Sequence, residues 1–199
     1  MEYDKLMMIG YFYYLLCNNV YYFSHNIEIC SRVYSTIHAS LAIIGSWVYL
    51  YTGSYWVYSI TVHNSIAYCL FDFPIILLVE RLRDPLMIFH HAAFLFGLWY
   101  FYQQHPSSVS RALLMETSTI PLNISWYMYK FNKTGSIFFT TTLICLLVSF
   151  FMFRIVGLTL SVIYAPSSFA MYFLGTLLAL NTFWFTKLSR LCYQKVWRR

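Results

Sequence analysis

The sequence predicts an all-α polytopic membrane protein. Of its 199 residues, 60% are hydrophobic and only 10% are charged, whereas a soluble domain carries about 25% charged residues. Its mean hydropathy is +0.58, and long apolar runs recur along the whole chain. These runs lack the short alternating pattern of transmembrane β-strands and are typical of membrane helices. A single transmembrane domain is expected over residues 1–199, with no soluble domain beside it.

Seven candidate spans are predicted, at residues 6–24, 33–53, 57–79, 85–103, 107–128, 135–157 and 167–190. Asn18 and Asn19 interrupt the first, which could instead lie in the membrane interface, so we expect six or seven transmembrane helices. Asp84 is predicted to cap the fourth span and Pro85 to be its first helical residue. The connections are short, which predicts antiparallel neighbouring helices.

Lysine and arginine residues predict the orientation of the chain. One set falls in the odd-numbered connections and at the C-terminus: Arg32, Arg81, Arg83, Lys130, Lys133, Lys187, Arg190, Lys195, Arg198 and Arg199. The opposite side holds only Lys5, Arg111 and Arg154. The positive-inside rule then predicts a cytosolic C-terminus. The net charge of +6 is explained by this topology, and no nucleic-acid partner is expected.

Polar residues within the spans are costly and are therefore candidates for function. Six of them fall about 8–14 Å below the predicted cytosolic surface at 1.5 Å rise per residue: His38, Asp72, His90, His91, Asn123 and Asn181. Their common depth predicts a shared polar pocket. Glu116 lies deeper and could pair with Arg111 or stay protonated, whereas His63 and Arg154 fall in the opposite half of the membrane.

The adjacent histidines indicate a chemistry. His90 and His91 lie about 100° apart on a helix, so one can face a cavity and the other a neighbouring span. One could act as nucleophile or general base, and Asp72 could fix a tautomer and stabilise an imidazolium. Acyl transfer fits such a group, and we predict His90, His91, Asp72 and His38 as catalytic residues. The alternative is that each histidine only forms an interhelical hydrogen bond.

A metal cofactor is not expected. Two ligands from one helix converge when they lie three or four residues apart, which the pair His90–His91 does not offer. The five cysteines are scattered singly and are predicted to be buried apolar side chains instead of a disulfide or metal framework.

A proline near the middle of the fifth span predicts a kink. Pro121 lacks a backbone donor and frees the carbonyl of Thr117, while the hydroxyls of Thr117, Ser118 and Thr119 can satisfy loosened backbone groups. A kink one turn from Glu116 is either an ordinary proline kink or the wall of a lipid cavity.

Five ordered segments resemble the TLC-domain family, which includes ceramide synthases and translocating-chain-associated membrane proteins. They are "SRVYSTIHA" (31–39), "YCLFDFP" with Asp72, "MIFHH" (87–91), "ETSTIPLNISW" (116–126) and "LNTFWFTK" (180–187). The likeness is strongest to the small TLC domain-containing branch, whose members often show an E-x-STP-x-x-N-x-x-W stretch. Here an Ile precedes the proline.

The resemblance implies one TLC-type domain, with a core at 30–192, that forms a compact helical barrel around a lipid-sized cavity. It also implies a location in the endoplasmic reticulum or a related membrane. His90 and His91 take the position of the double histidine with which ceramide synthases transfer an acyl group from acyl-CoA to a sphingoid base. The ceramide synthase signature continues with a histidine–aspartate pair and a further acid. This chain has only Glu116 there, so ceramide synthesis itself is not the expected reaction.

The favoured function is therefore transfer of an acyl group from acyl-CoA, as co-substrate, to an amine-bearing membrane lipid. Glu116, Asn123, Asn181 and Trp184 are predicted to bind the substrate. The alternative is a non-catalytic lipid-binding regulator of membrane lipid composition or trafficking. An ion or proton pathway through Glu116 and Arg154 is weaker, because the polar groups cluster in one half of the membrane.

Overall fold

The computed structural model describes residues 2–196, which form helices joined by short connections, with no strand among them. Arg198 and Arg199, predicted on the cytosolic side, lie outside the described residues. The chain divides into two compact units, Met1–Leu113 and Leu114–Arg199. Four helices are long and apolar enough to cross a membrane: Ile27–Thr52, Tyr55–Leu78, Ile137–Ile163 and Ser168–Lys195. The predicted helical membrane bundle is confirmed.

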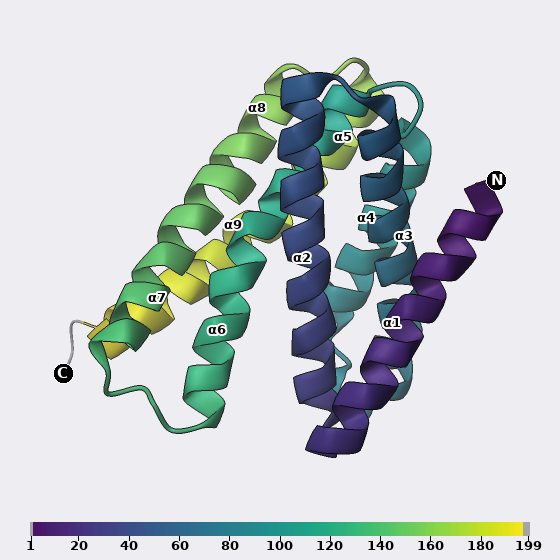
Figure 1. Cartoon of the computed structure of the whole chain (residues 1–199). Helices are drawn as coiled ribbons and strands as arrows, with labels where there is room; N and C mark the ends of the chain where they lie inside the picture. Colours follow the sequence, from purple (N-terminus) through teal and green to yellow (C-terminus); the bar gives the residue numbers. More distant parts are fainter. Residues whose placement is uncertain (1, 197–199) are drawn as a thin grey trace. The chain divides into compact units, whose positions relative to one another are not determined.

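The first unit is built around α3 (Tyr55–Leu78), which contacts α1 (Glu2–Ser24), α2 (Ile27–Thr52) and α4 (Pro85–Phe101) (Figure 1). The short helix α5 (Pro106–Leu113) packs on α2 and α4. More than half of the apolar window of α3 is buried, a larger share than in the other three candidate spans. Helix α3 is thus the most buried of the four long apolar helices.

Local sequence signals fix the helix ends of this unit. Asp84 accepts a hydrogen bond from the amide of Leu86, and Pro85 follows it at the first helical position, as predicted. Helix α2 begins after Asn26, whose side chain caps it, and ends at Gly53 in the left-handed conformation (φ 69°). Such a φ favours glycine, because a Cβ is strained there.

Helices α2 and α3 approach closely at Gly45. A Cβ built on Gly45 would lie only 1.9 Å from Oγ1 of Thr61. The absence of a side chain at this position therefore lets the two backbones meet, in the manner of small-residue packing in membrane helices.

The second unit contains a 3₁₀ segment η2 (Leu114–Ser118), α6 (Thr119–Lys130), α7 (Ile137–Ser149), the π-helical segment η3 (Phe150–Val156), α8 (Gly157–Ile163) and α9 (Ser168–Val196). Segments α7, η3 and α8 form one continuous helical run, Ile137–Ile163. Phe139, Leu143 and Cys192 form the core where α7 meets α9.

Two predicted spans differ from the structure in shape. The span at 107–128 is not a uniform helix: α5 gives way to η2 before α6 begins. Pro121 is the third residue of α6, in its first turn, where a missing amide donor leaves no hydrogen bond unmade.

The first predicted span is one helix through Asn19, whose side chain donates to the carbonyl of Leu15. Helix α1 is not among the four long apolar helices, and the number of crossings stays a prediction.

Candidate functional site

The first unit carries a row of polar side chains along α3. Asn64, Tyr68 and Asp72 follow one another at intervals of four residues, so they share one face of the helix. All three are buried, and only 3% of the surface of Asp72 is exposed. Buried polar groups must find partners nearby, and α1, α2 and α4 provide them.

Asp72 is the centre of this cluster. Its carboxylate accepts hydrogen bonds from the hydroxyl of Tyr34 on α2 and from the hydroxyl of Tyr68 on α3, the latter over 3.2 Å. Nε2 of His91 on α4 lies 2.8 Å from Asp72 Oδ2. Three helices therefore converge on one carboxylate through buried side chains. The term Asp72 cluster is used below for seven residues: Tyr13, Tyr34, His38, Asn64, Tyr68, Asp72 and His91.

The hydrogen bonds of His91 engage both nitrogens of its ring. Nδ1 lies 3.0 Å from the carbonyl oxygen of Met87, which can only accept, so Nδ1 carries a proton. Nε2 faces Oδ2 of Asp72, whose carboxyl group also accepts from two tyrosine hydroxyls. Both ring nitrogens of His91 are therefore engaged. The geometry is that of a buried, hydrogen-bonded histidine–carboxyl pair, which is an ion pair when the proton between the two side chains lies on Nε2.

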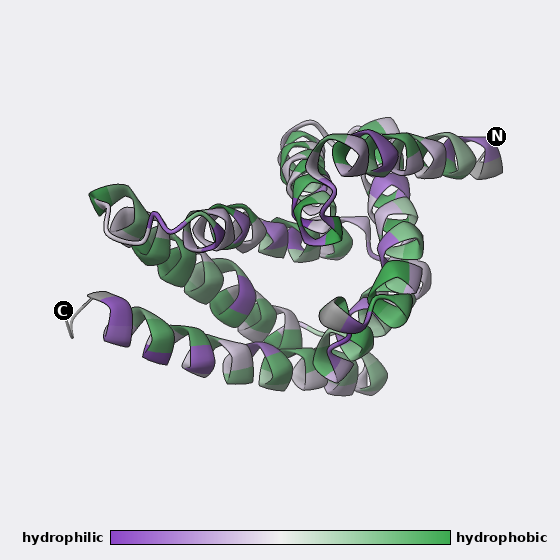
Figure 2. Cartoon of the chain, turned by 90° about the horizontal axis from the view of Figure 1, so that it is seen from below, coloured by the Kyte–Doolittle hydropathy of each residue, from purple (hydrophilic) through white to green (hydrophobic). Residues whose placement is uncertain are grey.

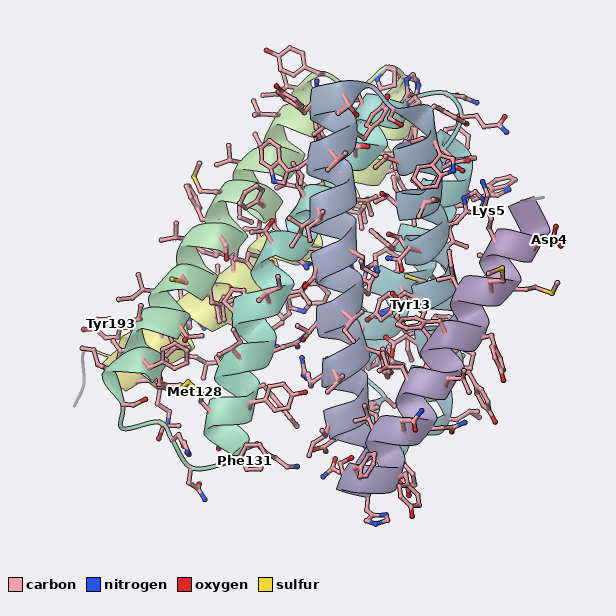
Figure 3. The ribbon with its side chains drawn as sticks, in the orientation of Figure 1. Asp4, Lys5, Tyr13, Met128, Phe131 and Tyr193 are labelled. Atoms are coloured by element: carbon pink, nitrogen blue, oxygen red, sulfur yellow. The ribbon has the colours of Figure 1, made fainter. Side chains whose placement is uncertain are left out.

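His38 joins the cluster from α2. Its ring stacks on that of Tyr68, with centroids 4.0 Å apart and planes 4° from parallel. Asn64 accepts from the hydroxyl of Tyr13 through Oδ1 at 2.8 Å, so its amide nitrogen faces His38 Nδ1 at 3.3 Å. Nδ1 of His38 is then the acceptor, and the ring is the neutral tautomer protonated at Nε2. Tyr13, on α1, is marked in Figure 3.

His90 differs from its neighbour in exposure. Its side chain is half-buried, whereas His91 is buried. The His90 ring lies perpendicular to that of His91 (88°, centroids 5.7 Å apart) and stacks on Phe94 at 6.2 Å. His63 is not part of the cluster; its Nδ1 lies 2.6 Å from the carbonyl oxygen of Ser59 within α3.

The second unit has its own buried polar group, centred on Arg154 in the π-helical segment. Its guanidinium donates to Ser118 Oγ (2.8 Å), Thr119 Oγ1 (3.2 Å) and Asn181 Oδ1 (3.4 Å). Glu116 Oε1 lies 3.9 Å from Arg154 Nη2, and Glu116 Oε2 accepts from Thr119 Oγ1 at 2.7 Å. The Thr119 hydroxyl thus bridges the two charges, and the site is neutral as a whole.

This arrangement gives Glu116 a partner and corrects the expected depth of Arg154. Glu116 lies close to Arg154, a partner that was not predicted for it from the sequence. Arg154 was expected in the opposite half of the membrane from Asn181, yet the two side chains are hydrogen-bonded. The reason is that the helical run continues to Ile163, six residues beyond the predicted boundary, so Arg154 lies well inside it.

The predicted site residues therefore fall into two groups. His38, Asp72 and His91 belong to one bonded cluster with His90 beside it, and Glu116 and Asn181 meet at Arg154. Two further predicted residues lie in the second unit: Asn123 buried in α6 and Trp184 half-buried in α9. The common pocket at one membrane depth stays a prediction.

Four members of the Asp72 cluster were not predicted from the sequence: Tyr13, Tyr34, Asn64 and Tyr68. Three of them carried a signal, because Tyr34 lies four residues before His38, and Asn64 and Tyr68 precede Asp72 at the same interval. Residues four apart share a helix face, so a search for polar partners at that spacing would have found them. Tyr13 carried no such signal among the many aromatic residues of its helix.

Comparison with known proteins agrees with this picture. The family model described as TRAM_LAG1_CLN8, TLC domain, matches residues 5–190, which include both polar groups. Among curated proteins, none matches the chain significantly. A match over nearly the whole chain, together with the long apolar helices, shows that the chain belongs to the TLC-domain family, as an integral membrane protein with a lipid-related function.

Proposed function

We propose that the protein transfers a fatty acyl group from acyl-CoA to the amine of a membrane lipid, with His90 acting on the substrate. The observation that supports this proposal is the buried contact between Asp72 and His91 directly beside a half-buried histidine, His90. Because both nitrogens of His91 are engaged, that residue is poorly suited to take a proton. The sequence-adjacent His90 is the better candidate for the general base.

In the proposed reaction, His90 accepts a proton from the amine while the amine nitrogen attacks the thioester carbonyl. The C–N bond forms, the C–S bond breaks, and the coenzyme A thiolate leaves and takes up the proton. The products are an amide and free coenzyme A. General base assistance of this kind contributes about 10²–10⁴-fold to a rate.

The Asp72–His91 pair has a positioning role in this scheme. Hydrogen bonds from two tyrosines fix the carboxylate, the carboxylate fixes the ring of His91, and the ring of His90 packs at a right angle against it. In this scheme the orientation of His90 depends on Asp72 through the ring of His91. We further propose Glu116, Asn123, Asn181 and Trp184 as residues that bind substrate.

A non-catalytic, lipid-binding regulator is the second candidate function. The burial of His38 and His91 favours it, since only 1% and 4% of these residues are exposed. A cluster with this burial can serve simply to hold four helices together. The two candidates differ in one respect that can be measured, because only the first makes a new lipid.

The test is an assay of the purified protein in nanodiscs, supplied with acyl-CoA and amine-bearing lipids and analysed by lipid mass spectrometry. Wild type is expected to form an N-acyl lipid, and His90→Asn to reduce its formation at least about 100-fold. The matched control is His25→Asn, because His25 is exposed and has φ 48°, which asparagine tolerates. Identical lipid profiles for wild type, both variants and empty nanodiscs would refute catalysis and favour the regulator.

We place the protein in the endoplasmic reticulum or a related membrane, with a cytosolic C-terminus. The sequence Asn132-Lys133-Thr134 is a glycosylation acceptor in the connection between α6 and α7 and lies on the same side as the C-terminus in this topology. Protease added to sealed microsomes is expected to remove a C-terminal epitope tag. A glycan on Asn132 would invert the orientation.

A further inference from the structure

The net charge of the protein is confined to its second unit. Glu116 is the last acidic residue of the sequence, and eight of the 13 basic residues follow it. Arg154 is buried against Glu116, and Glu116 is the one acidic residue that the sequence places in this unit with its eight basic residues. The first unit has six acidic and five basic residues and is close to neutral.

Five of these cations are described and exposed, and all lie toward one end of the unit: Lys130, Lys133, Lys187, Arg190 and Lys195. We call them the basic end. Contacts place the C-terminal parts of α6 and α9 together there, because Lys195 Nζ lies 6.0 Å from the ring of Tyr129. Met128 and Leu188 also pack against the core formed with Cys192. Figure 3 marks Met128, Phe131 and Tyr193 in this region.

The length of α9 places its cations at the level of lipid head groups. Its 29 residues extend about 43 Å, more than the roughly 30 Å hydrocarbon core of a bilayer. Residues 168–186 carry no charge and cover about 28 Å. If this uncharged stretch fills the core, Lys187, Arg190 and Lys195 emerge at the interface, where Figure 2 shows hydrophilic bands near the C-terminal end of the helix.

Aromatic rings accompany these cations. Lys187 Nζ lies 4.4 Å from the ring centroid of Phe183, and Lys130 Nζ lies 5.3 Å from that of Trp126. Tryptophan and tyrosine mark the membrane–water boundary, and long basic side chains reach from that depth toward phosphate groups. A concentration of exposed cations at this level has the charge and the position to bind acidic lipid head groups.

We propose that the basic end binds the head groups of anionic phospholipids in the leaflet that it faces. This goes beyond acyl transfer, since it holds whether or not the protein is catalytic. The partner is a bilayer lipid and not a soluble polyphosphate. The attraction between the cations and the anionic head groups is electrostatic. Each cation near the membrane surface is expected to raise lipid association roughly fivefold.

The test measures association of spin-labelled phosphatidylserine and phosphatidylcholine with the full-length protein in bilayers. Wild type is expected to prefer phosphatidylserine, and about 1 M NaCl to weaken that preference. The triple substitution Lys187→Gln/Arg190→Gln/Lys195→Gln is expected to lower it at least about fivefold. The control, Lys5→Gln/Arg111→Gln, changes cations that are predicted on the opposite side of the membrane and is expected to keep it.

A second variant, which leaves α9 unchanged, tests the proposal without the risk of a folding defect in that helix. Lys130→Gln/Lys133→Gln changes the other side of the basic end and should also reduce the preference, with unchanged helical content by circular dichroism. Equal binding of the two lipids by wild type, or equal losses in basic-end and control variants, would overturn the proposal. A third result would also overturn it. This is the case in which inorganic pyrophosphate, added to the protein in phosphatidylcholine nanodiscs, raised its unfolding temperature as much as phosphatidylserine in the bilayer does.

Discussion

Removal of the Asp72 carboxylate tests how the buried cluster holds the first unit together. In Asp72→Ala, two tyrosine hydroxyls lose their acceptor and Nε2 of His91 loses its partner in a buried site. Loss of one partner from a buried ion pair costs about 3–5 kcal/mol. For a protein of this size, each kcal/mol lowers the unfolding temperature by about 2–4 °C, so the expected decrease is roughly 6–20 °C.

Asp72→Asn should be milder. The asparagine Oδ1 can still accept from Tyr34, and its amide can donate to Nε2 of a neutral His91, but the N–H then faces the hydroxyl of Tyr68. Loss of a charge-assisted hydrogen bond costs about 1.5–3 kcal/mol, which corresponds to a decrease of about 3–12 °C.

Thermal unfolding of the purified protein, followed by circular dichroism in one detergent, measures both effects. Asp84→Asn is the matched control, because Asp84 only caps α4 and asparagine is an equally good cap. An Asp72→Asn protein that unfolded at the temperature of Asp84→Asn would refute the proposed role of the carboxylate. Equal losses for alanine and asparagine at position 72 would refute the hydrogen-bond assignment.

Three further predictions concern packing, the second polar group and a helix end. Gly45→Ala should destabilise the protein by about 1–3 kcal/mol, because its Cβ would overlap Thr61. The control Gly10→Ala should not destabilise it, because the space around Gly10 is open. Equal unfolding temperatures for the two variants would contradict the close helix contact. Arg154→Met and Glu116→Gln should each destabilise the protein, and the double variant should lose less than the sum; additive losses in a double-mutant cycle would show that the two charges do not interact. Gly53→Ala should cost about 1 kcal/mol, because φ there is 69°, and an unchanged unfolding temperature would argue against the left-handed cap.

The elements that composition and capping rules define could be predicted from the sequence. Asp84 followed by Pro85 marks the start of α4, and apolar runs locate the long helices. The end of the run Ile137–Ile163 was missed because Arg154 followed by Gly157 has the form of a helix stop signal, whereas the helix continues through both residues. The π-helical segment within it was missed as well, since a widened turn depends on packing around it.

The composition of the site was predicted only in part. Depth counting grouped His38 with Asp72 and His91, which the structure links through Tyr68. Depth says nothing about rotation around the helix axis, however, so it could not tell which of the two adjacent histidines meets the carboxylate. Tyr34 and Tyr68 were not among the predicted site residues, although they supply the hydroxyls that satisfy Asp72.

The central claim is a division of roles between the two adjacent histidines, with His91 fixed as an imidazolium by Asp72 and His90 left to act on substrate. The most direct measurement is the ¹⁵N NMR spectrum of histidine-labelled protein in bilayers, with His91 assigned by the signals that vanish in His91→Asn. Two protonated ring nitrogens on His91 at neutral pH, and one unprotonated nitrogen on His90, are predicted. An unprotonated nitrogen on His91 would contradict the claim.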